Sequence, residues 1–149
     1  MTEILFYHLT ESTLEDALPL LLERSLERGW KVVVESGNEE RITALNAHLW
    51  TYRDDGFLPH GAAGDAHPEE QPVYLSADAT NPNQANVRFY VDGSKPTKTE
   101  GYTRIVLMFD GHNNTEVADA RLEWKRLKAE GHELTYWQQN QDRRWEKKA

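Results

Sequence analysis

The residues of this 149-residue chain that are best suited to chemistry lie in one late stretch, 114–132, which reads as a helix. At about 100° per residue, Arg121, Lys125 and Lys128 fall on one face and Trp124 borders them. A ring beside several cations suits capture of an apolar side chain together with a carboxylate, because the ring desolvates the side chain and arginine pairs bidentately with the acid. The stretch therefore predicts a binding site for an acidic peptide.

The remaining residues of this stretch complete an amphipathic helix. Asn114 or Thr115 is expected to cap its start, and Gly131 to end it. The apolar stripe expected to pack on the core is Val117, Ala120, Trp124 and Leu127. The acids expected on the other side are Glu116, Asp119, Glu123 and Glu130. The helix is thus predicted to sort its charges by face.

Overall charge limits the partners. The chain has 17 Lys and Arg against 25 Asp and Glu, a formal net charge of -8. Such a surface repels nucleic acid and anionic membranes, so DNA is expected to be reached only indirectly and a membrane not at all. The lack of cysteine excludes disulfides and thiolate metal sites. With no long apolar run and no signal-peptide layout, we expect a cytoplasmic protein.

Short apolar runs alternate with stretches at helical spacing, which predicts an α/β protein with a parallel core sheet. The predicted strands are 4–9, 30–35, 72–76, 87–91 and 104–109. The second should be covered on both faces, and the last, the most apolar, should lie near the sheet centre. The length suits one domain, 1–149, with a polar tail from about residue 138.

Two further helices and the connections complete this prediction. One helix begins at a Ser12–Glu15 capping box and ends at Gly29, with Pro19 as an awkward member. The other spans 39–50 and is followed by a long loop, 51–71. Residues 134–137 are expected to form a short strand or a tucked segment.

The main alternative is a small nucleotide- or phosphate-binding enzyme on a Rossmann-like fold. It would hold its ligand near 10–13 or 36–38, after the first two strands. The first strand-to-helix turn contains no glycine, however, and a close backbone approach to pyrophosphate requires one. We therefore expect no nucleotide cofactor and no catalytic site.

Two lesser alternatives rest on local clusters. His60, His67 and Asp65 could chelate a metal, but loop residues of this kind are mostly solvated, so no metal is expected. Arg143 to Lys148, with Trp145, could touch nucleic acid, although the net charge opposes this. Trp50 and Phe57 could fill the core or line a pocket.

Several pieces, in their order and spacing, resemble the chi subunit of bacterial DNA polymerase III. They are Phe6-Tyr7-His8-Leu9, Leu49-Trp50, Phe57-Leu58-Pro59-His60-Gly61, Gln71-Pro72-Val73, Asn81-Pro82-Asn83, Asp92-Gly93, Ala120-Arg121 with Trp124-Lys125, and Gly131-His132-Glu133-Leu134-Thr135-Tyr136-Trp137.

The resemblance implies a three-layer α/β/α sandwich with a mostly parallel sheet and no catalytic role. It implies binding of the acidic C-terminal tail of single-stranded DNA-binding protein, which tethers the clamp loader to coated template, and a second partner in psi or another clamp-loader component. The tail pocket would use Trp50, Phe57, Arg121, Trp124 and Lys125. Trp124 stands where the family often has Tyr, and Val117 where some members have a basic residue.

Overall fold

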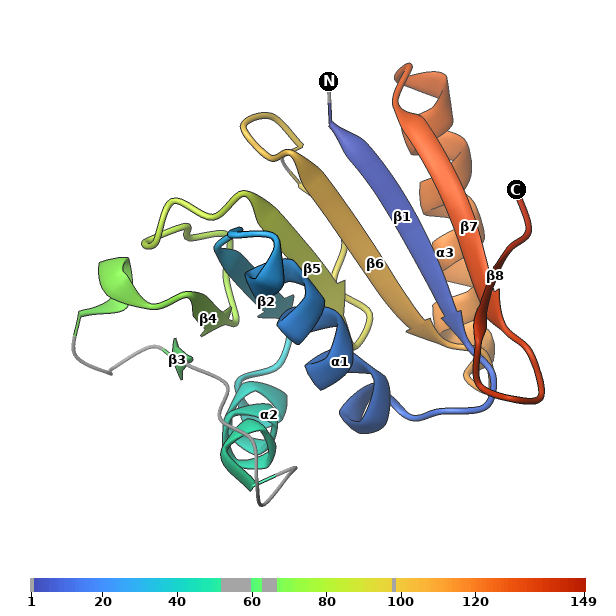
Figure 1. Cartoon of the computed structure of the whole chain (residues 1–149). Helices are drawn as coiled ribbons and strands as arrows, with labels where there is room; N and C mark the ends of the chain where they lie inside the picture. The colour runs from blue at the N-terminus through green and yellow to red at the C-terminus, as the bar shows by residue number, and fades with distance from the viewer. Residues whose placement is uncertain (1, 52–59, 63–66, 98) are drawn as a thin grey trace.

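The computed structural model describes residues 2–51, 60–62, 67–97 and 99–149, arranged around one eight-stranded sheet (Figure 1). Its order is β3-β4-β2-β5-β6-β1-β7-β8, parallel throughout except for the antiparallel β7–β8 pair. The strands are β1 Glu3–Leu9, β2 Val32–Ser36, β3 Gly61–Ala62, β4 Val73–Ser76, β5 Val87–Val91, β6 Arg104–Asp110, β7 Glu133–Gln139 and β8 Trp145–Lys147. The predicted strands are thus confirmed, with β6 near the centre and β2 buried along its length.

Helices cover both faces of the sheet, which makes the expected three layers. Alternate residues of β1 point to opposite sides: Leu5 joins a core cluster with the helices α1 (Leu14–Glu27) and α2 (Glu39–Thr51), whereas Phe6 joins one with α3 (Asn114–Ala129). Figure 1 shows α1 in front of the sheet, α2 below α1 in this view, and α3 behind β1 and β7. No helix in the described ranges is long and apolar enough to span a membrane.

Helix α1 begins one residue later than its predicted cap and contains its proline. Thr13, not Ser12, is the N-cap, and its side chain accepts a hydrogen bond from the Asp16 backbone N–H. Pro19 lies inside the helix and has no N–H to donate to the carbonyl four residues earlier, that of Glu15. The His48 ring on α2 contacts this carbonyl instead, with Nε2 2.7 Å from the oxygen.

Helix α3 matches its prediction except at two positions. Asn113 is the N-cap, one residue earlier than expected, and accepts from the backbone N–H groups of Thr115 and Glu116. The helix ends before Gly131, whose φ of 90° is the left-handed stop that glycine allows. Glu123 is buried rather than solvent-facing, and the Arg126 guanidinium binds its carboxylate.

The carboxyl-terminal segment is more ordered than a polar tail. β7 extends to Gln139 and pairs with β1, and β8 then returns antiparallel to it. β3 is likewise a short strand within the expected 51–71 loop. Periodicity in the sequence could not indicate β3 or β8, because strands of two and three residues are too short to show a repeat.

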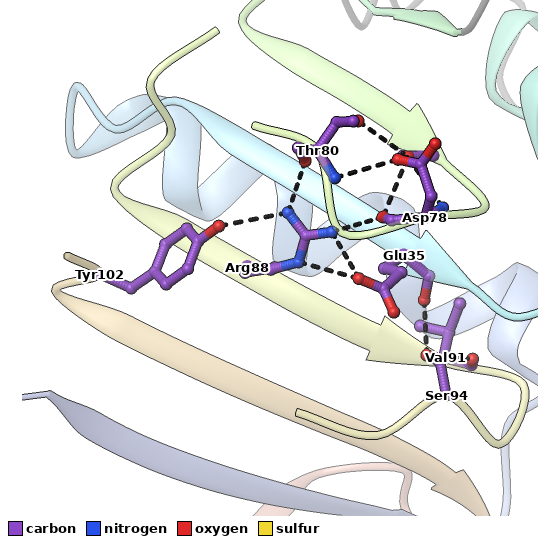
Figure 2. A network of polar contacts seen from close by, with 8 residues as sticks. Glu35, Asp78, Thr80, Arg88, Val91, Ser94 and Tyr102 are labelled. Carbon is purple, nitrogen blue, oxygen red and sulfur yellow. Dashed lines mark hydrogen bonds and ion pairs between the residues drawn. The ribbon is translucent and has the colours of Figure 1, made fainter. Parts of the chain in front are cut away.

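Loops, not a helix, cover the α3-side face of β2 and β5, and one arginine fixes them there (Figure 2). Arg88 is 1% exposed and bonds to the Glu35 carboxylate on β2. It also donates to the backbone carbonyls of Asp78 and Thr80, at 2.7 and 2.8 Å, and to the Tyr102 hydroxyl at 3.2 Å. A buried charge requires such complete pairing.

Candidate peptide-binding site

A cavity of about 410 Å³ opens between α3 and the strands beneath it. The ends of β6 and β1 supply Phe109 and His8, and β7 supplies Tyr136. Helix α3 supplies Arg121, Trp124 and Lys125 at i, i+3 and i+4, the spacing that places side chains on one face. The complete lining is His8, Phe109, Val117, Ala120, Arg121, Trp124, Lys125, Tyr136 and Ala149.

Packed rings form the floor of the cavity. The Trp124 indole meets Phe6 edge-on at 5.2 Å between centroids and Tyr136 edge-on at 5.9 Å. The His8 imidazole stacks on Phe109 at 4.8 Å. These contacts fix the ring positions, so an apolar side chain would find a preformed surface.

The polar pair in the floor carries no charge at neutral pH. The Tyr136 hydroxyl and His8 Nδ1 are hydrogen-bonded at 2.7 Å. Burial lowers the pKa of His8, and the charges of Arg121 and His112 lower it further while Asp110 opposes them. Burial raises the pKa of Tyr136, against the opposing effect of Arg121. The positive charge of the site therefore comes from its rim.

The rim cations are available for a ligand. Arg121 and Lys125 are exposed, and neither makes an ion pair with any residue that the structure describes. Arg126, on the other side of α3, instead pairs with Glu123 at 2.8 Å and Glu130 at 2.9 Å. The predicted sorting of charge is thus present, and the face beside Trp124 keeps unneutralised cations.

The six predicted site residues do not form one pocket. Trp50, 52% exposed, lies near the end of α2, on the opposite face of the sheet from α3, and its ring packs on His60 at 4.2 Å between centroids. Phe57 lies outside the described residues. Lys128 is exposed on α3 but does not line the cavity. The structure thus does not bring Trp50 to the α3 cavity, because α2 and α3 pack on opposite faces of the sheet.

Three ring residues of the floor were missed by the sequence analysis: His8, Phe109 and Tyr136. They are adjacent only because β1 lies between β6 and β7, with His8 paired to Phe109. The strand order was not predicted, so no local pattern could bring them together. The apolar ends of the first and fifth strands were the available signal.

A second cavity, of about 360 Å³, lies where the alternative enzyme would bind its ligand. Its wall includes 9–15 and the start of α3, but its charged members are mainly acids: Glu11, Glu15, Asp92, Asp110 and Glu116, with Arg41 and His112. Arg41 is already engaged by Glu15 and by Asp92 at 3.0 Å. Glu116 is partly buried in the wall of this cavity, and that burial raises the pKa of its carboxyl group. This crevice is unsuited to a phosphate.

Possible metal ligands are sparse. Within the described ranges, the group close enough to share an ion is His67, Glu69 and Glu70, all exposed. His60 is buried elsewhere, with Nε2 3.2 Å from the Asn46 carbonyl oxygen, and Asp65 lies outside those ranges. The His60–His67 combination, a lesser alternative from the sequence, is thus not among the described groups close enough to share an ion.

The sheet and its two helix layers define an α/β sandwich protein, and one of its cavities combines aromatic rings with cations. The chain belongs to the family of the DNA polymerase III chi subunit, HolC, which it matches over residues 1–135. It is also similar to a protein of Rickettsia prowazekii (strain Madrid E) described as a probable DNA polymerase III subunit chi. The two are 32% identical over 87 residues, covering 58% of this chain and 53% of the relative. The matched part thus spans about half the length of that relative. The family is one of accessory subunits of DNA polymerase III, which act in DNA replication.

Proposed function

We propose that this protein is a non-catalytic, clamp-loader-associated subunit that binds the acidic C-terminal tail of single-stranded DNA-binding protein in the α3 cavity. The observation that carries the proposal is the pairing of unneutralised Arg121 and Lys125 with a preformed ring floor. Psi or another clamp-loader component would be its second partner. DNA would be held through the tail-bearing protein.

Each part of the cavity has a task in this binding. The long-range field of Arg121, Lys125 and Lys128 attracts the acidic tail. Its last apolar side chain enters against Trp124 and the rings beneath it, and Arg121 pairs the terminal carboxylate. A contact of this size is expected to have micromolar affinity, about -7 to -8 kcal/mol, and to weaken with salt.

Calorimetric titration with a tail peptide ending in Pro-Phe tests the proposal. We expect Arg121→Ala to weaken binding by about tenfold or more, since it removes a bidentate ion pair, while the unfolding transition stays unchanged. Lys95→Ala is the matched control, because it removes one exposed cation that pairs with Asp119 rather than lining the cavity. Equal affinities of Arg121→Ala and wild type would refute the assignment.

Trp50 and Lys128 can be tested in the same titration. Lys128→Ala should weaken binding only about twofold, and only at low salt, because this lysine acts at a distance. Trp50→Ala should leave the affinity unchanged if the site is confined to the α3 face. A large loss with Trp50→Ala would restore Trp50 to the tail site and require a longer contact than the cavity provides.

A further inference from the structure

Two adjoining cavities lie on the face of the sheet opposite the proposed tail site. One, of about 490 Å³, separates α1 from the β7–β8 hairpin. The other, of about 110 Å³, continues between α1 and the start of β6. Leu21 and Arg24 line both, so we treat the two as one feature, the α1 groove.

The α1 groove concentrates positive charge on an acidic protein. Its arginines are Arg24, Arg28, Arg104, Arg143 and Arg144. Only Arg104 has an ion-pair partner in the described part of the chain, Glu3 at 3.2 Å, and its Nε is buried without a hydrogen-bond acceptor. The one acid in the lining is Asp16. On a chain of net charge -8, the α1 groove thus gathers four arginines that have no ion-pair partner among the described residues.

Four aromatic rings accompany these arginines in the lining. The Trp30 ring has two guanidinium groups near it, those of Arg28 at 5.1 Å and Arg104 at 5.0 Å from its centroid. Tyr7 packs against Trp137 at 6.4 Å and Trp145 at 4.7 Å. All four rings are partly exposed and line the groove.

We propose that the α1 groove binds single-stranded nucleic acid without sequence preference. Arginines would pair the phosphates, and exposed ring surface would stack on unpaired bases, the combination by which proteins hold single strands. The lining takes in residues of α1 from Asp16 to Ser25, about 14 Å at ~1.5 Å per residue, with Ser12 before the helix and Arg28 after it, which accommodates a few nucleotides. The inference goes beyond the tail-binding function and does not depend on it.

The distribution of cations and rings over the whole α1 groove favours single-stranded nucleic acid over an acidic peptide as its ligand. A carboxylate-ended tail needs one cationic end and one apolar pocket, whereas here both cavities of the groove contain cations and rings. A duplex could meet the arginines, but its stacked bases could not meet the rings. The net charge makes the binding weak and strongly dependent on salt.

Fluorescence anisotropy of labelled oligothymidylate of about 15 nucleotides, titrated with the full chain near 20 mM NaCl, measures this binding. Arg24→Gln should weaken it several-fold, and Arg24→Gln combined with Arg143→Gln and Arg144→Gln by more than about tenfold with a shallower salt dependence. Lys95→Gln, which removes one positive charge outside the groove, is the matched control. Circular dichroism checks that each variant is folded.

Further outcomes decide between occupants. Trp145→Phe should keep most of the affinity and Trp145→Leu should lose about tenfold, since stacking needs a ring. The proposal is overturned if wild type does not bind near 20 mM NaCl, or if Arg24→Gln binds like Lys95→Gln. It is also overturned if an oligoaspartate displaces the labelled strand as well as unlabelled oligothymidylate does, which would indicate a site for acidic polypeptides. Arg121→Ala should bind the strand like wild type, and an equal loss there would instead place the strand on the α3 face.

Discussion

The His8 imidazole is one group through which the free energy of unfolding depends on pH. Burial and the neighbouring Arg121 and His112 charges lower its folded-state pKa below the ordinary value of 6.5. As pH falls through 6.5, the unfolded chain takes up a proton that the folded chain does not, so the free energy of unfolding decreases until the folded-state pKa is passed. The contribution of His8 to the free energy of unfolding is therefore fully present above pH 6.5 and is lost as the pH falls below it.

Urea unfolding between about pH 7 and pH 5 checks this expectation. Wild type should lose a small part of its stability toward the acid end, and His8→Gln should lose less over the same interval because it cannot take up that proton. Identical slopes would show that His8 is not the responsible group. Its partial exposure keeps the effect small.

Arg121, Trp124 and Lys125 are predictable from the sequence as neighbours because one helix carries all three, and the helical period places them on one face. Trp50 does not lie beside them in the structure, because the relation between two helices depends on which face of the sheet each crossover takes. His8 could not be predicted as a neighbour, because its surroundings are set by strand order. Local spacing is readable, but long-range adjacency is not.

At the scale of elements, α1 keeps its buried proline by using a neighbouring helix. His48 on α2 meets the Glu15 carbonyl that Pro19 leaves without a backbone donor. We expect His48→Leu to lower the free energy of unfolding by about 1–2 kcal/mol, since it leaves this acceptor unsatisfied. With Pro19→Ala, which restores an N–H, the cost of His48→Leu should fall. A double-mutant cycle by urea unfolding measures this coupling, and purely additive effects would contradict it.

The Arg88 network binds β2, β5 and the loop between β4 and β5 into one unit. Arg88→Met should cost about 3–5 kcal/mol of unfolding free energy, because Glu35 is left buried without its cation. Adding Glu35→Met should recover part of that loss. Lys148→Met, which removes an ion pair whose two side chains are 50% and 49% exposed, is the control and should cost less than about 1 kcal/mol. A cost for Arg88→Met as small as the control's would contradict a structural role for the network.

Element types were largely predictable and element edges were not. Apolar, β-branched runs predicted the strands β1, β2, β4, β5 and β6. Such runs are readable because a strand covered on both faces of a sheet must be apolar along its length. The caps moved by one residue, to Thr13 and Asn113, because adjacent Ser, Thr and Asn residues cap equally well in sequence. Arg88 lies inside a predicted strand and is buried in the structure, where it fixes the loops that cover one face of the sheet.

Considered as a whole molecule, the protein places its two cationic features on opposite faces of one sheet. The tail cavity belongs to the α3 side, and the α1 groove to the α1 side, within an overall charge of -8. An acidic peptide bound in the cavity would add negative charge yet touch none of the groove. We therefore expect the two ligands to bind at the same time, and the only coupling between them to be a screened electrostatic repulsion through the sheet.

Anisotropy titration of labelled oligothymidylate with and without saturating tail peptide tests this arrangement. The strand's affinity should change by less than about twofold, and the difference should disappear as salt approaches about 150 mM, where the screening length is ~8 Å. Direct competition, with the strand displaced in proportion to peptide bound, would mean that both ligands use the cavity. Arg121→Ala separates the cases: it should abolish any effect of the peptide while the strand still binds, because the peptide's anchor is lost and the α1 groove is untouched.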